Sequence, residues 1–334
     1  MAGKTLYSLA ALCLSFYLFS CAPKTENQST SSVTYSYNAP MVKIFSPEVE
    51  DTVHLMLVAD THLWMSDDRE EPFRTHSKRM AGAYHATRHF QTLEATNPEK
   101  SFLHVLGMAK EKKVDAIALL GDIVSYPSEY AVEWAKGKLD SIGIPYYYIA
   151  GNHDWHYEGM EGSSIELRDT WAKKRLMPLV GPHNPLMYSV DVKGVKLLFI
   201  DDSVYEILPE QLDFFRQEDS QGKPMLLMMH IPVYAPGREV GFGVGHPDWN
   251  AAHDTSYELE RRNRWAAEGH KPETFAFYDA VLSSSNLMAT FTGHVHRNGV
   301  DVIQGKPFFT IKENASGGYC EVWIIPAPKS RSNR

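Results

Sequence analysis

The hydrophobic pattern of the first half of the chain alternates between two periods. Short apolar runs, typical of buried strands, are separated by segments whose apolar residues recur at helical spacing. The pattern predicts strands at 54–59, 114–120 and 146–150, with helices at about 101–112 and 129–142 between them. This alternation of strand and helix predicts a largely parallel sheet.

The second half of the chain has more strands and shorter connections. Strand-like runs occur at 187–192, 195–200, 225–229, 287–291, 307–311 and 319–325. Several are joined by tight turns such as Lys193-Gly194. Two sheets packed face to face, with helices outside, accommodate both halves in one domain. We therefore predict an α/β fold of two packed mixed sheets flanked by helices, spanning residues 48–328.

Residues 1–20 have the pattern of a signal peptide. Lys4 precedes an uncharged, largely apolar stretch over 5–23, and Leu18-Phe19-Ser20-Cys21 resembles the lipobox of a bacterial lipoprotein. We expect cleavage before Cys21 and lipidation of its thiol, with residues 21–47 as a flexible tether. The protein is then exported and held on a membrane, facing the periplasm or the cell exterior. The alternative is an uncleaved membrane anchor, because this stretch is nearly long enough to span a bilayer.

Composition and charge exclude several classes of protein. The chain is 43% hydrophobic, 12% aromatic and 22% charged, which is close to the globular average and argues against disorder or a multi-span membrane protein. Its formal net charge of −8 disfavours a nucleic acid polymer as partner. Because Cys13 and Cys21 belong to the predicted export signal, we expect no internal disulfide and a buried Cys320.

Side chains that can bind metal follow five of the predicted strands directly. In an open α/β sheet, residues just past the carboxyl ends of neighbouring strands meet in one crevice. On extended backbone, Asp60 and His62 point the same way, and the same holds for His294 and His296. The glycines before three of the motifs allow sharp turns. The motifs are Asp60-Thr61-His62, Gly121-Asp122, Gly151-Asn152-His153-Asp154, His230 and Gly293-His294-Val295-His296.

The donor set identifies the kind of metal. Carboxylate, carboxamide and imidazole groups without thiolate suit Mn, Fe, Zn, Co or Mg and argue against a cysteine-rich structural zinc site. Two carboxylates, one asparagine and four histidines are too many for one tetrahedral ion. They are sufficient for two divalent ions that share a carboxylate.

These motifs, in this order, resemble the signature of the calcineurin-like metallophosphoesterases over about residues 53–312. The resemblance implies a four-layer sandwich that hydrolyses phosphate esters. It implies that Asp60, His62 and His296 hold one ion and that Asn152, His230 and His294 hold the other. It further implies that Asp122 bridges the two ions, and that His153 lies beside the leaving-group oxygen without binding metal.

The expected chemistry uses two ions about 3.5–4 Å apart. A water bridging them is acidified towards a pKa of about 7 and attacks phosphorus in line, while His153 protonates the leaving oxygen. Asp154 either orients that imidazole or caps the following helix. Whether the substrate is a monoester or a diester stays open. The rival interpretation is a non-catalytic metal-binding scaffold or ligand-binding module, which a missing ligand would favour, and none is missing.

The chain departs from two branches of the family that it resembles. Ser/Thr protein phosphatases have an Asp-Arg pair after the Gly-Asp motif, whereas Gly121-Asp122 is followed here by Ile123. Purple acid phosphatases have an iron-binding tyrosine three residues after that Asp, where this chain has Ser125. We therefore expect a small phosphorylated substrate rather than a phosphoprotein, and no ferric tyrosinate centre.

Three inserts, at 64–97, 155–185 and 235–272, are too long for ordinary connections, and we predict that they form a rim that selects the substrate. His85 and His89 lie four residues apart on a predicted helix of the first insert. Because no third ligand adjoins them, we interpret them as part of a polar helix face. His54 is expected to be structural. Asp201-Asp202 ends another strand and could reach the site, but we interpret it as a turn.

Overall fold

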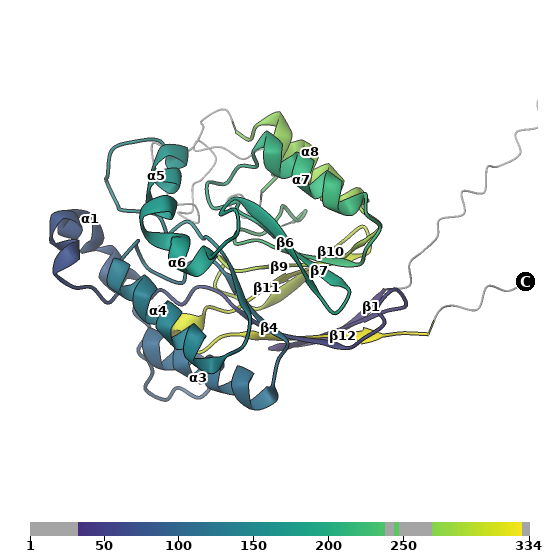
Figure 1. Ribbon diagram of the computed structural model, residues 1–334, viewed down its shortest axis with the longest axis horizontal. Coiled ribbons are helices and arrows are strands. Elements are labelled where there is room, and N and C mark those ends of the chain that lie inside the picture. The colour runs from purple at the N-terminus through teal and green to yellow at the C-terminus, as the bar shows by residue number, and fades with distance from the viewer. Residues whose placement is uncertain (1–32, 238–243, 247–268, 329–334) are drawn as a thin grey trace, which may run out of the picture. The chain divides into compact units, whose positions relative to one another are not determined.

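The computed structural model describes residues 33–237, 244–246 and 269–328, whose strands form two sheets (Figure 1). The first sheet has the order β1 (Thr34–Asn38), β2 (Met41–Ser46), β12 (Cys320–Pro326), β3 (Val53–Val58), β4 (Ala116–Leu120), β5 (Tyr146–Ile149). The second has the order β10 (Gly299–Ile303), β11 (Lys306–Thr310), β9 (Leu287–Thr292), β8 (Met225–Met228), β7 (Val195–Ile200), β6 (Met187–Val192).

Both sheets are mixed. Strands β3, β4 and β5 are parallel, as the alternation of strands and helices predicts. In the second sheet β7, β8, β9 and β11 are parallel, while β6 and β10 pair antiparallel at its edges. The predicted fold class, two packed mixed sheets flanked by helices, is therefore confirmed.

Helices cover the outer face of each sheet. The first sheet is covered by α3 (Pro98–Lys112), α4 (Glu129–Ile142), α5 (Ser164–Trp171), the π-helical turn η2 (Ala172–Leu176) and α6 (Met177–Val180). The second is covered by α7 (Pro209–Asp219) and α8 (Pro272–Ser283). The short helices η1 (Asp68–Phe73), α1 (Arg74–Ser77) and α2 (Met80–Ala83) lie in the first insert, and η3 (Asn314–Ser316) precedes β12.

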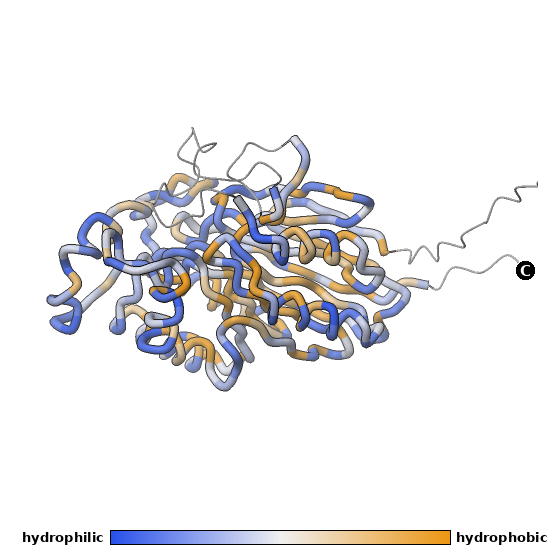
Figure 2. Tube along the Cα trace, turned by 90° about the horizontal axis from the view of Figure 1, so that it is seen from above, coloured by the Kyte–Doolittle hydropathy of each residue, from blue (hydrophilic) through white to orange (hydrophobic). Residues whose placement is uncertain are grey.

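The core has three layers of apolar side chains because the central strands are buried on both faces. Leu55 and Leu57 of β3 face the second sheet, and Met56 and Val58 face the helices. Such strands read as continuous apolar runs rather than as alternating patterns. In Figure 2 the strands in the middle carry the orange, hydrophobic stretches, and the outer helices show both orange and blue, hydrophilic residues.

Capping residues set the bounds of the two long helices. The side chain of Asn97 accepts a hydrogen bond from the backbone of Lys100, and therefore α3 begins at Pro98, before the predicted start at 101. Ser128 caps α4 in the same way, and Gly143 ends it in the left-handed conformation. The predicted range of α4, 129–142, is confirmed.

The prediction of a tether over 21–47 is wrong for residues 34–46. Strands β1 and β2 occupy this part, and β2 pairs in parallel with β12 so that Val42 lies opposite Val322. Val42 and Ile44 are completely buried, which supplies the apolar contacts that hold the segment in the sheet. The predicted signal peptide, Cys21 and the remainder of the tether lie outside the described residues. In the part of the chain that the structure describes, no helix has the length and hydrophobicity to cross a membrane.

The last strand of the chain returns to the first sheet, where β12 lies between β2 and β3. Its antiparallel register with β3 places Cys320 opposite Leu57, and Cys320 is buried, as predicted. His54 of β3 donates from Nε2 to the Glu321 carboxylate at 2.9 Å and stacks on Trp323 with a ring separation of 3.6 Å. The predicted structural role of His54 is thus confirmed.

Candidate metal centre

The carboxyl ends of five strands bring the seven predicted ligands together. Asp60 and His62 follow β3, Asp122 follows β4, Asn152 follows β5, His230 follows β8, and His294 and His296 follow β9. Backbone hydrogen bonds extend the pairing beyond β3 and β4: Asp60 donates to Gly121 at 3.0 Å, and His62 donates to Asp122 at 2.9 Å. The predicted convergence of these side chains at one edge of the sheets is therefore present, although the residues are far apart in sequence.

One group of donors consists of Asp60, His62 and His296. The Nε2 atoms of the two histidines are 3.2 Å apart, and His296 Nε2 lies 3.2 Å from Asp60 Oδ1. One donor atom from each residue falls within 4.8 Å of the others. Burial holds the pKa of His62 well below its usual range, so the imidazole keeps a lone pair for a cation.

The other group contains Asp122, His230 and His294, whose donor atoms also lie within 4.8 Å of one another. Asn152 joins it, because its Oδ1 is 3.1 Å from both His230 Nε2 and His294 Nδ1. His230 Nε2 is 3.2 Å from Asp122 Oδ2. Burial lowers the pKa of His230, but the charge of Asp122 outweighs it and raises that pKa to about 10. The charge of Asp122 thus favours positive charge at the position of His230, while a bridge from Asp122 to the first group stays a prediction.

Hydrogen bonds behind the second group fix which histidine nitrogen faces inwards. His230 Nδ1 lies 2.8 Å from the carbonyl oxygen of Leu120, an acceptor that places the proton on Nδ1 and leaves Nε2 for a ligand. His294 is turned the other way. Its Nε2 is 3.2 Å from the Tyr205 hydroxyl, and its Nδ1 faces Asn152.

The ligand motifs are not extended, which corrects the geometry that we predicted for Asp-x-His and His-x-His. Five of the seven donors adopt the left-handed backbone conformation, which is uncommon for residues with a side chain and concentrates at functional sites. It is held in place by bonds such as that from Ala315 N to Asp60 O at 3.0 Å. The φ angles are 54° at Asp60, 53° at His62, 53° at Asp122, 66° at His294 and 52° at His296.

The glycines of the motifs act in two ways. Gly121 has a φ of 82°, which confirms the predicted turn. Gly293 instead gives space: a Cβ there would lie 2.5 Å from Asp60 Oδ2. A Cβ on Gly151 would likewise collide with Asp122 Oδ1. Two carboxylates therefore pack directly against backbone, which a larger residue would prevent.

His153 lies beside the first group. Its backbone N–H donates to Asp122 Oδ1 at 2.7 Å, and its ring is nearly perpendicular to that of His62 at 5.0 Å. The carboxylate of Asp154 has a role that we did not predict. It accepts backbone hydrogen bonds from Gly151 and Asp122 at 2.8 Å and from Val124 at 2.9 Å, so it ties the loops after β4 and β5 together. Burial and the charge of Asp122 raise the pKa of Asp154 to about 7.

Asp201 and Asp202 do more than form a turn. Asp201 accepts from buried Arg168 at 3.0 Å. Asp202 Oδ1 accepts the backbone N–H groups of His230 and Ile231, both at 3.1 Å, and so positions the loop that carries His230. The sequence allowed contact with the site but did not favour it over a turn, because these bonds join the ends of different strands.

The first insert reaches the site through Tyr84, which no motif singled out. Its ring stacks on His62 with a centroid separation of 4.3 Å. The helix predicted to contain His85 and His89 is wrong, because α2 ends at Ala83. A large part of the third insert lies outside the described residues, and selection of substrate by the inserts stays a prediction.

The donors fit two divalent ions. Each group offers a carboxylate and two imidazoles, and the second adds an amide oxygen.

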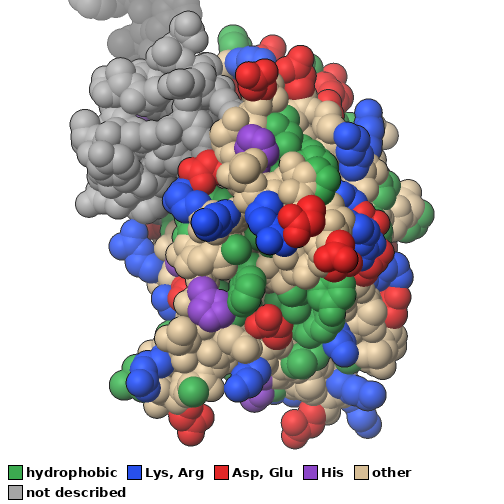
Figure 3. Space-filling view, turned by 90° about the vertical axis from the view of Figure 1, so that its left-hand side faces the viewer, with side chains coloured by type: hydrophobic (Ala, Val, Ile, Leu, Met, Phe, Trp, Pro, Cys, Tyr) green, Lys and Arg blue, Asp and Glu red, His purple; other side chains and the backbone are tan. Residues whose placement is uncertain are grey.

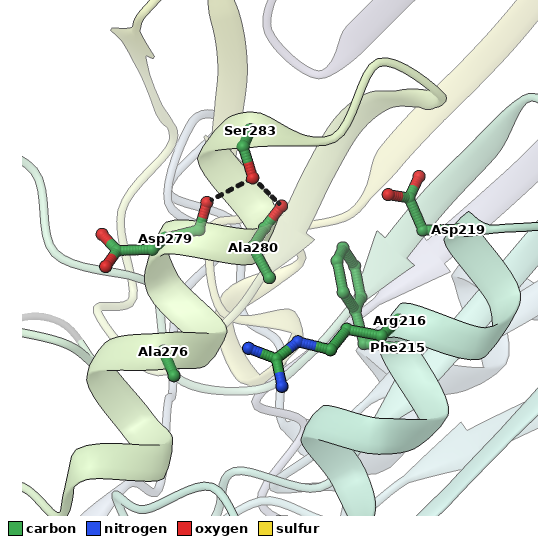
Figure 4. Close-up of a pocket in the computed structure, with 7 residues that line it drawn as sticks. All are labelled: Phe215, Arg216, Asp219, Ala276, Asp279, Ala280 and Ser283. Atoms are coloured by element: carbon green, nitrogen blue, oxygen red, sulfur yellow. Dashed lines mark hydrogen bonds between the residues drawn. The ribbon is translucent and has the colours of Figure 1, made fainter.

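Figure 3 shows the side of the molecule where α1 and α5 lie, with histidines reaching the surface and lysines and arginines between them. A hollow between α7 and α8 shares no residue with either group (Figure 4). It is lined by Phe215, Arg216, Asp219, Ala276, Asp279, Ala280 and Ser283.

Two mixed sheets that present carboxylate and imidazole groups at their strand ends have the architecture of a metallophosphoesterase. The sequence model of the calcineurin-like phosphoesterase family matches residues 53–298, and the chain belongs to this family. The structure of a dimetal phosphatase from Danio rerio superposes with a TM-score of 0.50 at 13% identity, covering 82% of this chain and 93% of that one. At this identity the likeness concerns the fold.

Two sequence relatives bear a more specific name. A probable cyclic nucleotide phosphodiesterase from Psychrobacter sp. (strain PRwf-1) is 24% identical over 217 residues, which is 61% of this chain and 53% of the relative. A second, from Psychrobacter arcticus, is 24% identical over 204 residues, which is 59% of this chain and 62% of the relative. The matched part of the chain thus spans less than two thirds of either relative.

Proposed function

We propose that this protein hydrolyses phosphate esters, and phosphodiesters in particular, with two divalent metal ions. The observation that carries the proposal is the convergence of seven donors in two groups at one edge of the sheets. Membership of the calcineurin-like phosphoesterase family supports phosphoester hydrolysis. The preference for diesters is supported by the names of the two Psychrobacter relatives.

Each residue has an assigned role in this proposal. Asp60, His62 and His296 hold one ion, Asn152, His230 and His294 hold the other, and Asp122 serves both. The ions are drawn from Mn, Fe, Zn, Co and Mg, which suit oxygen and imidazole donors. When bound, they activate water and neutralise charge on the phosphoryl group.

His153 donates the proton to the leaving oxygen. The backbone N–H of His153 donates to Asp122 Oδ1 at 2.7 Å, and this bond holds the imidazole beside the metal donors, where the substrate would bind. The residue is 3% exposed, and removal from bulk water strengthens the interaction of its imidazole with a developing negative charge. A general acid in such a position contributes typically about 10²–10⁴ in rate.

Removal of metal is expected to abolish turnover, because no side chain of the site can replace two cations beside a phosphate group. The purified protein is stripped with a chelator, reloaded with each candidate metal, and assayed on cyclic nucleotides, other phosphodiesters, phosphomonoesters and pyrophosphates. We expect recovery on reloading and the highest kcat/KM on a diester.

Three outcomes would change the proposal. Full turnover in chelator contradicts the two-metal function. A folded protein that binds two ions but turns over no ester supports the scaffold alternative. Faster hydrolysis of monoesters than of diesters makes the protein a phosphatase.

We also propose that the protein is lipidated at Cys21, supported by the Leu18-Phe19-Ser20-Cys21 motif. Each buried methylene of an acyl chain contributes about 0.8 kcal/mol to membrane binding. Cys21→Ser is expected to block lipidation and the coupled cleavage, giving a larger chain on a gel that incorporates no labelled fatty acid and keeps full phosphoesterase activity. Mass spectrometry that finds Met1 on the mature wild-type protein contradicts the lipoprotein.

A further inference from the structure

The histidines of the two donor groups differ in the hydrogen bonds of the ring nitrogen that faces away from the other donors. A metal-binding histidine ordinarily gives its second nitrogen to a hydrogen-bond acceptor, which fixes the plane of the ring. His230 and His294 have such partners in Leu120 O and the Tyr205 hydroxyl. His62 turns Nε2 towards His296, and its buried Nδ1 has no hydrogen-bond partner among the described residues.

An aromatic ring packs on the face of the His62 imidazole instead. The ring of Tyr84 is stacked on His62, with a centroid separation of 4.3 Å and an angle of 17° between the planes. The same ring is nearly perpendicular to His153 at 4.9 Å and to His296 at 5.3 Å. Tyr84 therefore contacts both imidazoles of the first group and the imidazole proposed as the general acid.

The insert that carries Tyr84 is anchored close to the site. Beyond Tyr84, the backbone N–H of Phe90 donates to Ser316 O at 3.0 Å, and Lys312 Nζ lies 5.7 Å from the centre of the Phe90 ring. The loop at 312–318 in turn donates from Ala315 N to Asp60 O at 3.0 Å. The insert thus contacts the first group directly through the ring of Tyr84, and it also bonds the loop at 312–318 that holds the backbone of Asp60.

We propose that Tyr84 is a positioning residue of the first metal site, and that its ring, instead of a hydrogen bond, fixes the plane of His62. This inference rests on the proposed two-metal function. It assigns to the insert at 64–97 control over the affinity of one ion, while Tyr205 supports the other. Tyr84 acts through its ring face and Tyr205 through its hydroxyl. Loss of the hydroxyl should therefore leave metal affinity nearly unchanged at Tyr84 and lower it at Tyr205.

Metal affinity separates these roles without any assay of turnover. Each variant is dialysed against a graded chelator buffer, and the bound metal is counted by elemental analysis. We expect Tyr84→Leu to lower the affinity for one of the two ions by about 10- to 100-fold, the usual effect of losing a residue that orients a metal ligand. Tyr84→Phe, which keeps the ring, is expected to stay within about twofold of wild type. Tyr205→Phe is expected to weaken the other ion.

A double variant identifies which of the two ions depends on Tyr84. Asp60→Ala removes a donor of the first group, so adding Tyr84→Leu to it should leave the affinity of the remaining ion unchanged. His85→Ala is the matched control, because it removes a ring from the same insert. The ring of His85 contacts Trp64 and neither donor group. It should keep both affinities and the melting temperature of wild type.

Several results would overturn the inference. Equal weakening by Tyr84→Phe and Tyr84→Leu assigns the effect to the hydroxyl. Weakening of both ions to the same extent assigns it to general damage of the fold, and unchanged binding removes the role altogether. A wild-type protein that binds fewer than two ions contradicts the proposed function instead, so the two failures are distinguishable.

Discussion

Asp122→Asn is expected to abolish phosphoester hydrolysis, with a loss of at least about 10³-fold in kcat. Asp122 Oδ2 lies 3.2 Å from His230 Nε2, and Oδ1 accepts the backbone N–H of His153 at 2.7 Å. Burial alone would raise the pKa of Asp122, but the charges of His230 and His153 hold it well below its usual range. The amide has nearly the same shape and lacks the negative charge that neutralises and spaces two cations. Turnover and metal content are measured on the same preparation.

Asp115→Asn is the matched control for the loss of a carboxylate. Asp115 precedes β4, whereas Asp122 follows it, so the two residues lie at opposite ends of one strand. Its Oδ2 accepts the backbone N–H of His54 at 2.9 Å, far along the strand from the donor groups. The control should keep wild-type turnover. Undiminished turnover of Asp122→Asn would exclude the two-metal mechanism.

His153→Ala is expected to retain both ions and to lose about 10²–10⁴ in rate on substrates with leaving groups of high pKa. Substrates whose leaving group is stable as an anion need no proton, and their rates should change much less. The slope of log kcat/KM against leaving-group pKa should therefore become steeper than in wild type. Elemental analysis checks that the metal content is unchanged.

The control for His153 is His104→Ala, which removes an exposed imidazole from α3 and should leave the slope as it is. Two outcomes contradict the assignment of His153. Loss of one ion would make it a metal ligand. An equal loss of rate on every leaving group would give it a role in binding rather than in proton transfer.

Local pattern was enough to place the elements that carry the site. The predicted bounds of α4, β6 and β7 agree with the structure, because each is a single run of one period between turn or cap residues. The position of every predicted ligand at a strand end followed from the same pattern. Parallel strands then required their ends to meet, so convergence of these side chains could be expected from the sequence.

The sequence by itself determined most of the strands, the two long helices of the first half, the type of fold and the side chains gathered at one edge of it. Tertiary structure alone decided that residues 34–46 belong to the sheet, because the strand residue that lies opposite Val42 is Val322, at the other end of the chain. It likewise decided the left-handed backbone at the ligands, the bonds of Asp154 to two loops and the stacking of Tyr84 on His62. Periodicity reports only which positions of one segment are buried, whereas these features depend on contacts between distant segments that leave no local pattern.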